Sequence, residues 1–258
     1  MYDYVWAFAV LVVLMDVIPV VERRYVISEK IDETPDVLVL KFMPEDGKPW
    51  AFDPGMFMMI SGIDGAGKRC VARAFSIASD PSTPGMDFMV IREPRHGDHI
   101  GRSHFVDAKV GDTFIMRGPN GQFRFDPKHN KKVVFIAGGT GLAPFISMVR
   151  HIKATHAESD AILLYSTRFP TEIIYRNEIE GYKELGIKVI VTVTRPEAGD
   201  GWTGQTGHID APMLQRYVQD LQDRTYYICG PLAFVKAVKE ALALLKVDAS
   251  KVMADVWG

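Results

Sequence analysis

The pattern of apolar residues changes once along the chain, and this change constrains the fold more than any other feature of the sequence. From residue 24 to about residue 125, short apolar runs are separated by turns rich in Pro, Gly and Asp, a pattern typical of β-strands. Six such runs predict a small antiparallel barrel, with strands at 25–31, 36–42, 56–62, 71–77, 86–94 and 113–118. After residues 129–132, buried strands alternate with helical segments, which predicts βαβ units and a parallel sheet.

The second half of the chain has the element order of a doubly wound domain. We expect strands at 132–139, 161–166, 188–194, 225–230 and 251–258, and helices at 142–155, 171–186, 211–222 and 232–246. The change of pattern places the domain boundary near residues 126–131. The sequence therefore predicts two domains: an antiparallel β-barrel over 23–128 and an α/β doubly wound parallel-sheet domain over 129–258, preceded by an apolar arm over 1–22.

Charge and cysteine content exclude several classes of function. The formal net charge of −2 and the lack of a long basic run argue against a nucleic-acid partner. The two cysteines, Cys70 and Cys229, are too few for an iron–sulfur cluster or a four-cysteine zinc site. This low cysteine number fits a protein of a reducing compartment better than a disulfide framework. The spacing of His96, His99 and His104 matches no ligand motif, so we expect no metal site.

The N-terminal segment from Tyr4 to Val21 is strongly apolar, with Asp16 as its only charged residue. As a helix of about 18 residues it would extend roughly 27 Å, slightly less than a bilayer core. Arg23 and Arg24 follow it, so a spanning segment would leave the rest of the chain in the cytoplasm. Two interpretations stay open: a membrane anchor, or an arm buried against this protein or a partner subunit. The expected location is cytoplasmic, with possible attachment to the cytoplasmic face of a membrane.

Two glycine-containing turns join a predicted strand to a predicted helix. In IAGGTGLAP (136–144), the glycines allow close approach of a ligand, and the helix start favours a phosphate or pyrophosphate. A tight packing turn is the alternative. YICGP (227–231) contains one of the two cysteines, and both turns would flank one crevice at the carboxyl ends of the strands. A buried, inert cysteine is the alternative there.

The run RAFSIAS (73–79) carries an arginine in a short apolar strand. Because side chains alternate along a strand, one face carries Arg73, Phe75, Ile77 and Ser79. The opposite face carries Ala74, Ser76 and Ala78. Arg73 on such a face suggests a charged or planar ligand, and an exposed edge strand with a solvated arginine is the alternative.

Five motifs occur in a fixed order: RAFS, a predicted hairpin GPNGQF (118–123), GGTGLAP, CGP and a C-terminal aromatic residue. Together they resemble the ferredoxin–NADP reductase family over about residues 24–258. The ending DVWG is also similar to that of cytochrome P450 reductase, a diflavin relative. The resemblance implies an FAD-binding barrel followed by an NAD(P)-binding domain. No flavodoxin-like or ferredoxin domain is recognisable, so the chain looks like the flavin–nicotinamide module alone.

The resemblance also implies roles for individual residues in flavin binding. Arg73 would pair with the flavin phosphate, Phe75 would pack on the isoalloxazine, and Ser76 would donate a hydrogen bond near N5. The family usually has tyrosine where this chain has Phe75, so one hydroxyl contact is lost. Further flavin contacts are expected from Ala74, Val90, Gly101, Arg102 and Ser103. For the last three, an ordinary surface loop is the alternative.

For hydride transfer, the resemblance implies a constellation of Ser76, Cys229, Asp255 and Trp257. Cys229 would lie beside nicotinamide C4, and Asp255 would stabilise charge or assist protons near N5. Trp257 would cover the flavin face that the nicotinamide occupies and would move during catalysis. An ordinary last strand is the alternative for DVWG. The nucleotide would also contact a second set of residues in the turns: Gly139, Thr140, Gly141, Gly230 and Pro231.

The preference for NADP(H) over NAD(H) depends on arginines near the ends of two strands. Thr194 and Arg195 match the positions of a 2′-phosphate site in relatives, and Arg168 and Arg176 are further candidates. Ordinary surface arginines are the alternative. The expected function is a flavin-dependent NAD(P)H oxidoreductase, with hydride transfer between NADPH and FAD N5 and then one-electron transfer to ferredoxin or flavodoxin. The alternatives are a reductase subunit of a larger, possibly membrane-associated complex, and a non-catalytic scaffold.

Overall fold

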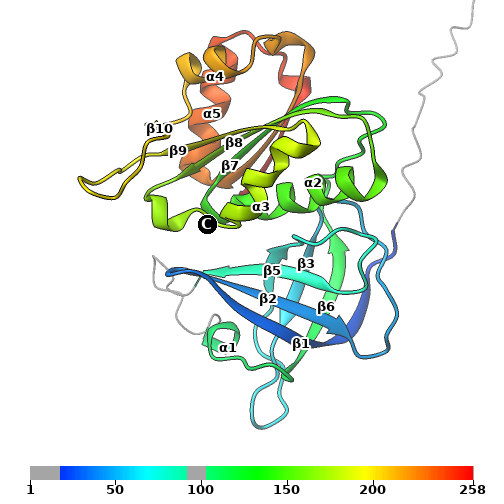
Figure 1. Cartoon of the computed structure of the whole chain (residues 1–258). Coiled ribbons are helices and arrows are strands. Elements are labelled where there is room, and N and C mark those ends of the chain that lie inside the picture. The colour runs from blue at the N-terminus through cyan, green and yellow to red at the C-terminus, as the bar shows by residue number, and fades with distance from the viewer. Residues whose placement is uncertain (1–17, 92–102, 258) are drawn as a thin grey trace, which may run out of the picture.

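The chain forms two six-stranded sheets, one antiparallel and one parallel, which lie one above the other in Figure 1. The structure is a computed structural model that describes residues 18–91 and 103–257. Residues 121–131 connect the two sheets. This arrangement confirms the predicted fold class, a barrel followed by a doubly wound domain.

The antiparallel sheet is a nearly closed barrel with the strand order β4-β3-β6-β1-β2-β5. Apolar side chains that alternate along the strands fill its interior, among them Tyr25, Phe42, Phe88 and Phe114. Its helix α1 spans Ser103–Val106. The strands are β1 Val21–Thr34, β2 Val37–Pro44, β3 Phe57–Ser61, β4 Arg73–Ser76, β5 Met86–Ile91 and β6 Thr113–Asn120.

The parallel sheet has the order β10-β9-β8-β7-β11-β12 and is covered on both faces, as a parallel sheet requires. Helices α2 (Ala143–Thr155) and α3 (Arg176–Gly181) share one apolar cluster with barrel residues, and they lie between the two sheets (Figure 1). Helices α4 (Ala211–Tyr217) and α5 (Leu232–Leu244) cover the other face. The strands are β7 Lys132–Gly138, β8 Asp160–Thr167, β9 Lys188–Val193, β10 Gln205–Thr206, β11 Thr225–Pro231 and β12 Val252–Trp257. The 3-10 helices are Gly139–Leu142, Pro170–Glu172, Tyr182–Leu185, Leu221–Asp223 and Ala249–Lys251.

Three predicted elements were wrong in extent or type. The helix expected over 171–186 is reduced to the 6 residues of α3, since Tyr175 adopts a left-handed conformation (φ 51°) and its N–H donates to Glu33 Oε1 at 2.6 Å. The helix expected over 211–222 ends at Tyr217. The hairpin expected at 118–123 is absent from the described fold: β6 continues to Asn120, which pairs with Phe57 of β3.

The apolar N-terminal segment lies largely outside the described residues. The described part begins at Ile18, and Val20 and Val21 are exposed where β1 starts. Within residues 18–91 and 103–257, no helix has the length and apolarity needed to cross a bilayer.

Candidate functional site

A cavity of about 310 Å³ lies where the two halves of the chain meet. One wall comes from the barrel and the connection that follows it, and the other comes from the last strand, β12. Its volume falls at the lower end of the range for small-molecule sites. The lining residues are Gly55, Phe57, Gly121, Gln122, Phe123, Met253, Ala254 and Asp255.

Strand register brings three of the four predicted hydride-transfer residues to this cavity or next to it. Asp255 lines it directly, and Cys229 is its register partner on the neighbouring strand β11. On the barrel side, Ser76 is the register partner of Phe57, which also lines the cavity. Residues far apart in the sequence are therefore placed around one space by the pairing of β3 with β4 and of β11 with β12.

Burial sets the protonation chemistry of the parallel-sheet wall. Cys229 is 1% exposed, and burial, with a smaller contribution from Asp255, raises the pKa of its thiol far above the ordinary value. The thiol is therefore neutral at pH 7 and is not a nucleophile. Burial also raises the pKa of the Asp255 carboxyl, against a smaller effect of the Val256 N–H. The cavity thus has one destabilised carboxylate at its wall, and a neutral thiol is buried beside it on the neighbouring strand.

Trp257 ends strand β12, where its backbone pairs in register with Pro231 of the CGP turn. Its side chain lies outside the part of the structure that is described. The stacking role of Trp257 therefore stays a prediction, although its backbone lies beside the turn that would receive the nicotinamide. In Figure 1 the C-terminal end lies between the two domains.

Strand β4 presents the RAFS motif at the edge of the barrel sheet. Phe75 is half-buried, and its ring lies edge-on to Phe105 with a centroid distance of 4.8 Å. Arg73 is also half-buried, and Ala74 is exposed. The barrel core thus orients the Phe75 ring and leaves part of it accessible, which fits a residue that packs against a planar ligand.

The other predicted flavin contacts are placed less favourably or are not described. Val90 is 1% exposed inside the barrel core, so only its backbone could face a ligand. Gly101 and Arg102 lie outside the described residues. Ser103 begins helix α1, but its side chain is not described. His96 and His99 also lie outside the description, and the described residues hold no group of three metal-ligating side chains.

The glycines of the GGTG turn serve different purposes. Gly141 is a packing glycine, since a Cβ there would lie 2.3 Å from the carbonyl oxygen of Cys229. Gly138 and Gly230 both make room for the ring of Phe234. Gly139 has a φ of +55° and open space around it, so it provides the left-handed backbone without a packing contact. A ligand site and a tight packing turn, the two alternatives for this motif, are compatible in one segment.

Replacing Gly141 by alanine is expected to destabilise the fold by about 1–3 kcal/mol, because the new methyl group must displace the backbone of Cys229 and Gly230. Urea unfolding checks this value. Gly181→Ala is the matched control, since its Cβ would meet nothing within 4 Å, its φ of −73° is helical, and alanine has a higher helix propensity than glycine. Equal stability of the two variants would contradict the packing role of Gly141.

The arginines proposed for a 2′-phosphate differ in their availability. The Arg195 side chain is exposed, and within the described residues it forms no ion pair. The backbone N–H groups of Thr194 and Arg195 donate to the carbonyl oxygens of Thr167 and Arg168. Arg168 is held by Glu172 and by Asp36 of the barrel, the latter at 3.3 Å. Arg176 donates to Pro170 O and lines a wider cavity of about 560 Å³ that also contains Glu33 and Glu178. Arg195 is therefore the best-placed candidate of the three.

A barrel followed by a doubly wound domain, with a cavity where the two meet, is the architecture of two-domain flavoprotein reductases. Known proteins agree with this class. The family model of the oxidoreductase NAD-binding domain matches residues 135–240. Ferredoxin–NADP reductase B of Sorangium cellulosum is 30% identical over 215 residues, covering 80% of this chain and 85% of that protein.

Two further similarities involve longer proteins. The glycine betaine monooxygenase reductase subunit of Pseudomonas aeruginosa is 30% identical over 231 residues, covering 88% of this chain and 62% of the relative. The chain thus spans less than two thirds of that relative. The solved structure described as the ferredoxin reductase in carbazole 1,9a-dioxygenase superposes with a TM-score of 0.79 at 25% identity, covering 94% of this chain and 71% of that one.

The chain belongs to the ferredoxin–NADP reductase family, which confirms the resemblance of its motifs. Several cavity residues nevertheless carry no signal in the sequence. Phe57 and Gly55 belong to no motif, and their place depends on the barrel register. Gln122 and Phe123 are part of GPNGQF, which does point to this region. Phe234 could have been suspected from its position just after CGP.

Proposed function

We propose that the chain is a flavin-dependent NAD(P)H oxidoreductase that passes electrons from a nicotinamide to a separate carrier protein. One observation carries this proposal: the cavity between the halves joins Asp255, next to Cys229, to the barrel strands that hold Ser76. An inert scaffold would have no need for an open space lined by a destabilised carboxylate.

The residues present fit a flavin at this place. The Phe75 ring is oriented by Phe105 and remains partly accessible, and Gly55 and Gly121 line the cavity with backbone alone. A bound flavin would supply hydride acceptance from the nicotinamide and one-electron release to the carrier. Ser76 would hold the flavin edge, and the neutral Cys229 would give the nicotinamide an apolar, uncharged wall. Asp255 would place negative charge near the nicotinamide ring, which gains positive charge as it loses hydride.

The purified protein provides the direct test. We expect a yellow preparation with a flavin absorption spectrum, FAD rather than FMN on extraction, and NADPH-driven reduction of ferricyanide. A colourless, inactive preparation that FAD cannot reconstitute would refute the proposal and favour the scaffold.

Replacing Arg195 by alanine is expected to weaken the binding of NADPH by about 10–100-fold and to leave the binding of NADH nearly unchanged. The reason is that a guanidinium contact to a phosphate contributes about 1.5–3 kcal/mol. The Michaelis constants for both coenzymes measure this. Arg168→Ala is the control, since Arg168 bonds to Glu172 and Asp36 and should affect both coenzymes equally. Equal losses for NADPH and NADH in Arg195→Ala would place the 2′-phosphate site elsewhere.

The names of similar proteins support a protein as the electron acceptor. Similar proteins are named as reductase subunits of monooxygenase and demethylase systems and as a ferredoxin–NADP reductase. We therefore infer a protein acceptor, either ferredoxin, flavodoxin or the oxygenase component of such a system. Both cysteines are free, which fits a cytoplasmic location. Stimulation of NADPH-dependent cytochrome c reduction by added ferredoxin or flavodoxin tests this assignment.

A further inference from the structure

Helix α2 connects the two cofactor sites of the proposed reductase. At its N-terminal end it follows the glycine turn, whose Gly141 packs against Cys229. In its middle, Met148 reaches the cavity wall, where a Cβ on Gly55 would lie 2.7 Å from Met148 Cε. The helix therefore contacts both the nicotinamide half and the barrel wall of the cavity.

Three side chains on one face of α2 hold the chain that leaves the RAFS strand. Ser147, Arg150 and His151 have the spacing i, i+3 and i+4, so they lie on the same side of the helix. Ser147 Oγ donates to Ser79 O at 2.7 Å, and this serine is fully buried. His151 Nδ1 lies 2.9 Å from a carboxylate oxygen of Asp80.

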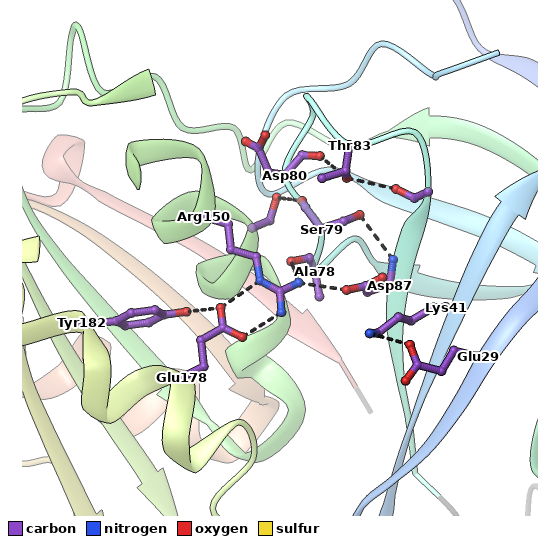
Figure 2. A network of polar contacts seen from close by, with 12 residues as sticks. Glu29, Lys41, Ala78, Ser79, Asp80, Thr83, Asp87, Arg150, Glu178 and Tyr182 are labelled. Carbon is purple, nitrogen blue, oxygen red and sulfur yellow. Dashed lines mark hydrogen bonds and ion pairs between the residues drawn. The ribbon is translucent and has the colours of Figure 1, made fainter. Parts of the chain in front are cut away.

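Arg150 is the centre of this contact (Figure 2). Its Nη1 donates to Ala78 O at 3.1 Å and to Asp87 Oδ2 at 2.9 Å, which are both in the barrel. Its Nε and Nη2 donate to the two carboxylate oxygens of Glu178 in α3, each at 2.8 Å. The guanidinium also lies over the ring of Tyr175 at 5.1 Å. One side chain thus joins the barrel, α2 and α3.

The held residues follow the flavin strand almost directly. β4 ends at Ser76, and Ala78, Ser79 and Asp80 are the residues that α2 grips. Asp87 of β5 adds a second fixed point, since its carbonyl accepts from the N–H of Ala78. The bonds lie at a largely buried interface, where the Arg150 side chain is 23% exposed and that of Asp87 is 16% exposed. Broken bonds there would leave charged groups poorly solvated.

We propose that Ser147, Arg150 and His151 are positioning residues: through α2 they set the distance between the nicotinamide turn and the flavin strand. The proposal rests on the proposed function, since it assumes a flavin at β4 and a nicotinamide at the glycine turn. Hydride transfer needs its two reacting atoms about 3–3.5 Å apart, and a misplacement of about 1 Å can cost 100-fold in rate. A rigid link between the two binding elements meets that requirement.

Arg150→Lys tests the link. Lysine keeps the positive charge but cannot serve Ala78 O, Asp87 and both Glu178 oxygens together. We expect flavin reduction at saturating NADPH to slow by about 10–100-fold. The flavin content and the dissociation constant of NADPH should change little, and the charge-transfer absorbance between nicotinamide and flavin should weaken. A merely structural role would lower flavin content or stability without that change in absorbance.

A second measurement tests the contact between α2 and residues 78–80 in the absence of any cofactor. Hydrogen exchange of the peptide over residues 77–88 should become about tenfold faster in flavin-free Arg150→Lys. Arg224→Lys is the matched control, because Arg224 also joins two carboxylates, Asp220 and Asp160, but away from the barrel. It should lower stability without changing exchange at 77–88 or the rate of flavin reduction.

Ser147→Ala is the milder variant, which removes one hydroxyl and keeps all charges. It should give the same effects on a smaller scale if Arg150→Lys does not fold. Wild-type exchange at 77–88 and wild-type flavin reduction in both variants would overturn the proposal. Failure of the wild-type chain to bind or reduce flavin would instead refute the proposed function, while the exchange experiment would still decide whether α2 holds this segment.

Discussion

Replacing Asp255 by asparagine is expected to slow NADPH-dependent flavin reduction by about 100-fold. Asp255 is the only charged residue among those lining the described cavity between the two halves. Its carboxylate would favour the positive charge that the nicotinamide gains, and fixed charges of this kind are worth about 100-fold or more when removed. Stopped-flow reduction at saturating NADPH measures the effect. An unchanged rate would remove Asp255 from the catalytic constellation.

The same substitution is expected to stabilise the fold at neutral pH. Because burial raises the pKa of Asp255 in the folded state, its contribution to stability is present below the ordinary carboxyl pKa of about 4 and is lost as the pH rises through the raised value. Asparagine stays neutral throughout. The free energy of unfolding of the variant should therefore rise relative to that of the wild type as the pH increases from 4 to 7.

Asp220→Asn is the control, because its effect on the free energy of unfolding is expected to have the opposite sign. Hydrogen bonds from Arg224 and Lys132, against a smaller effect of burial, lower the pKa of Asp220 to about 2. Its stabilising contribution is present above the unfolded value and is lost as the pH falls through about 2. The control variant should lose stability at pH 7, where Asp255→Asn gains it. A loss of stability in both variants would contradict a destabilised carboxylate at position 255.

The strands of both domains were predictable because their signals are local. The continuous apolar runs in 36–42 and 132–139 correspond directly to β2 and β7. The helix over 171–186 failed for a nonlocal reason. Its apolar spacing is helical, but Glu33 of the barrel accepts a hydrogen bond from the N–H of Tyr175 and stabilises a left-handed residue there. A contact between residues so far apart in the chain has no signature in either segment.

The site was predictable to the extent that strand ends determine it. Cys229 and Asp255 lie on adjacent parallel strands, so the doubly wound topology brings them together. The barrel side depends on register instead. A register shift in the pairing of β3 with β6 lies between Phe57, the β3 residue that lines the cavity, and Met59, and the sequence of β3 does not indicate it. The contact of α2 with the segment that follows β4 was not predicted for a similar reason, since the sequence pattern places Arg150 on the surface of an amphipathic helix.

Truncating Trp257 to alanine is expected to raise the apparent affinity for NADH by about 30–100-fold and to slow release of the oxidised nucleotide. The register of β12 places this residue opposite Pro231, at the turn proposed for the nicotinamide. An indole that covers the flavin must leave before the nicotinamide can stack there. Displacing an aromatic ring that stacks on a flavin would cost about 2–3 kcal/mol, and removing the ring removes that cost. The nicotinamide is the same in both coenzymes, so both bind more tightly. With NADPH, which the 2′-phosphate contact already holds, the gain slows product release, and the preference therefore shifts toward NADH.

Two measurements separate this competition from a simple structural effect. The Michaelis constants for NADH and NADPH should both fall, and the turnover with NADPH should fall because product release becomes limiting. Trp257→Phe is the matched control, since it keeps an aromatic ring and should retain most of the discrimination. Because Trp257 lies at the end of an edge strand, the free energy of unfolding of the flavin-free chain should change little in either variant. An unchanged coenzyme preference in Trp257→Ala would show that the indole does not compete with the nicotinamide, and the coenzyme preference would then depend on Arg195 and its neighbours alone.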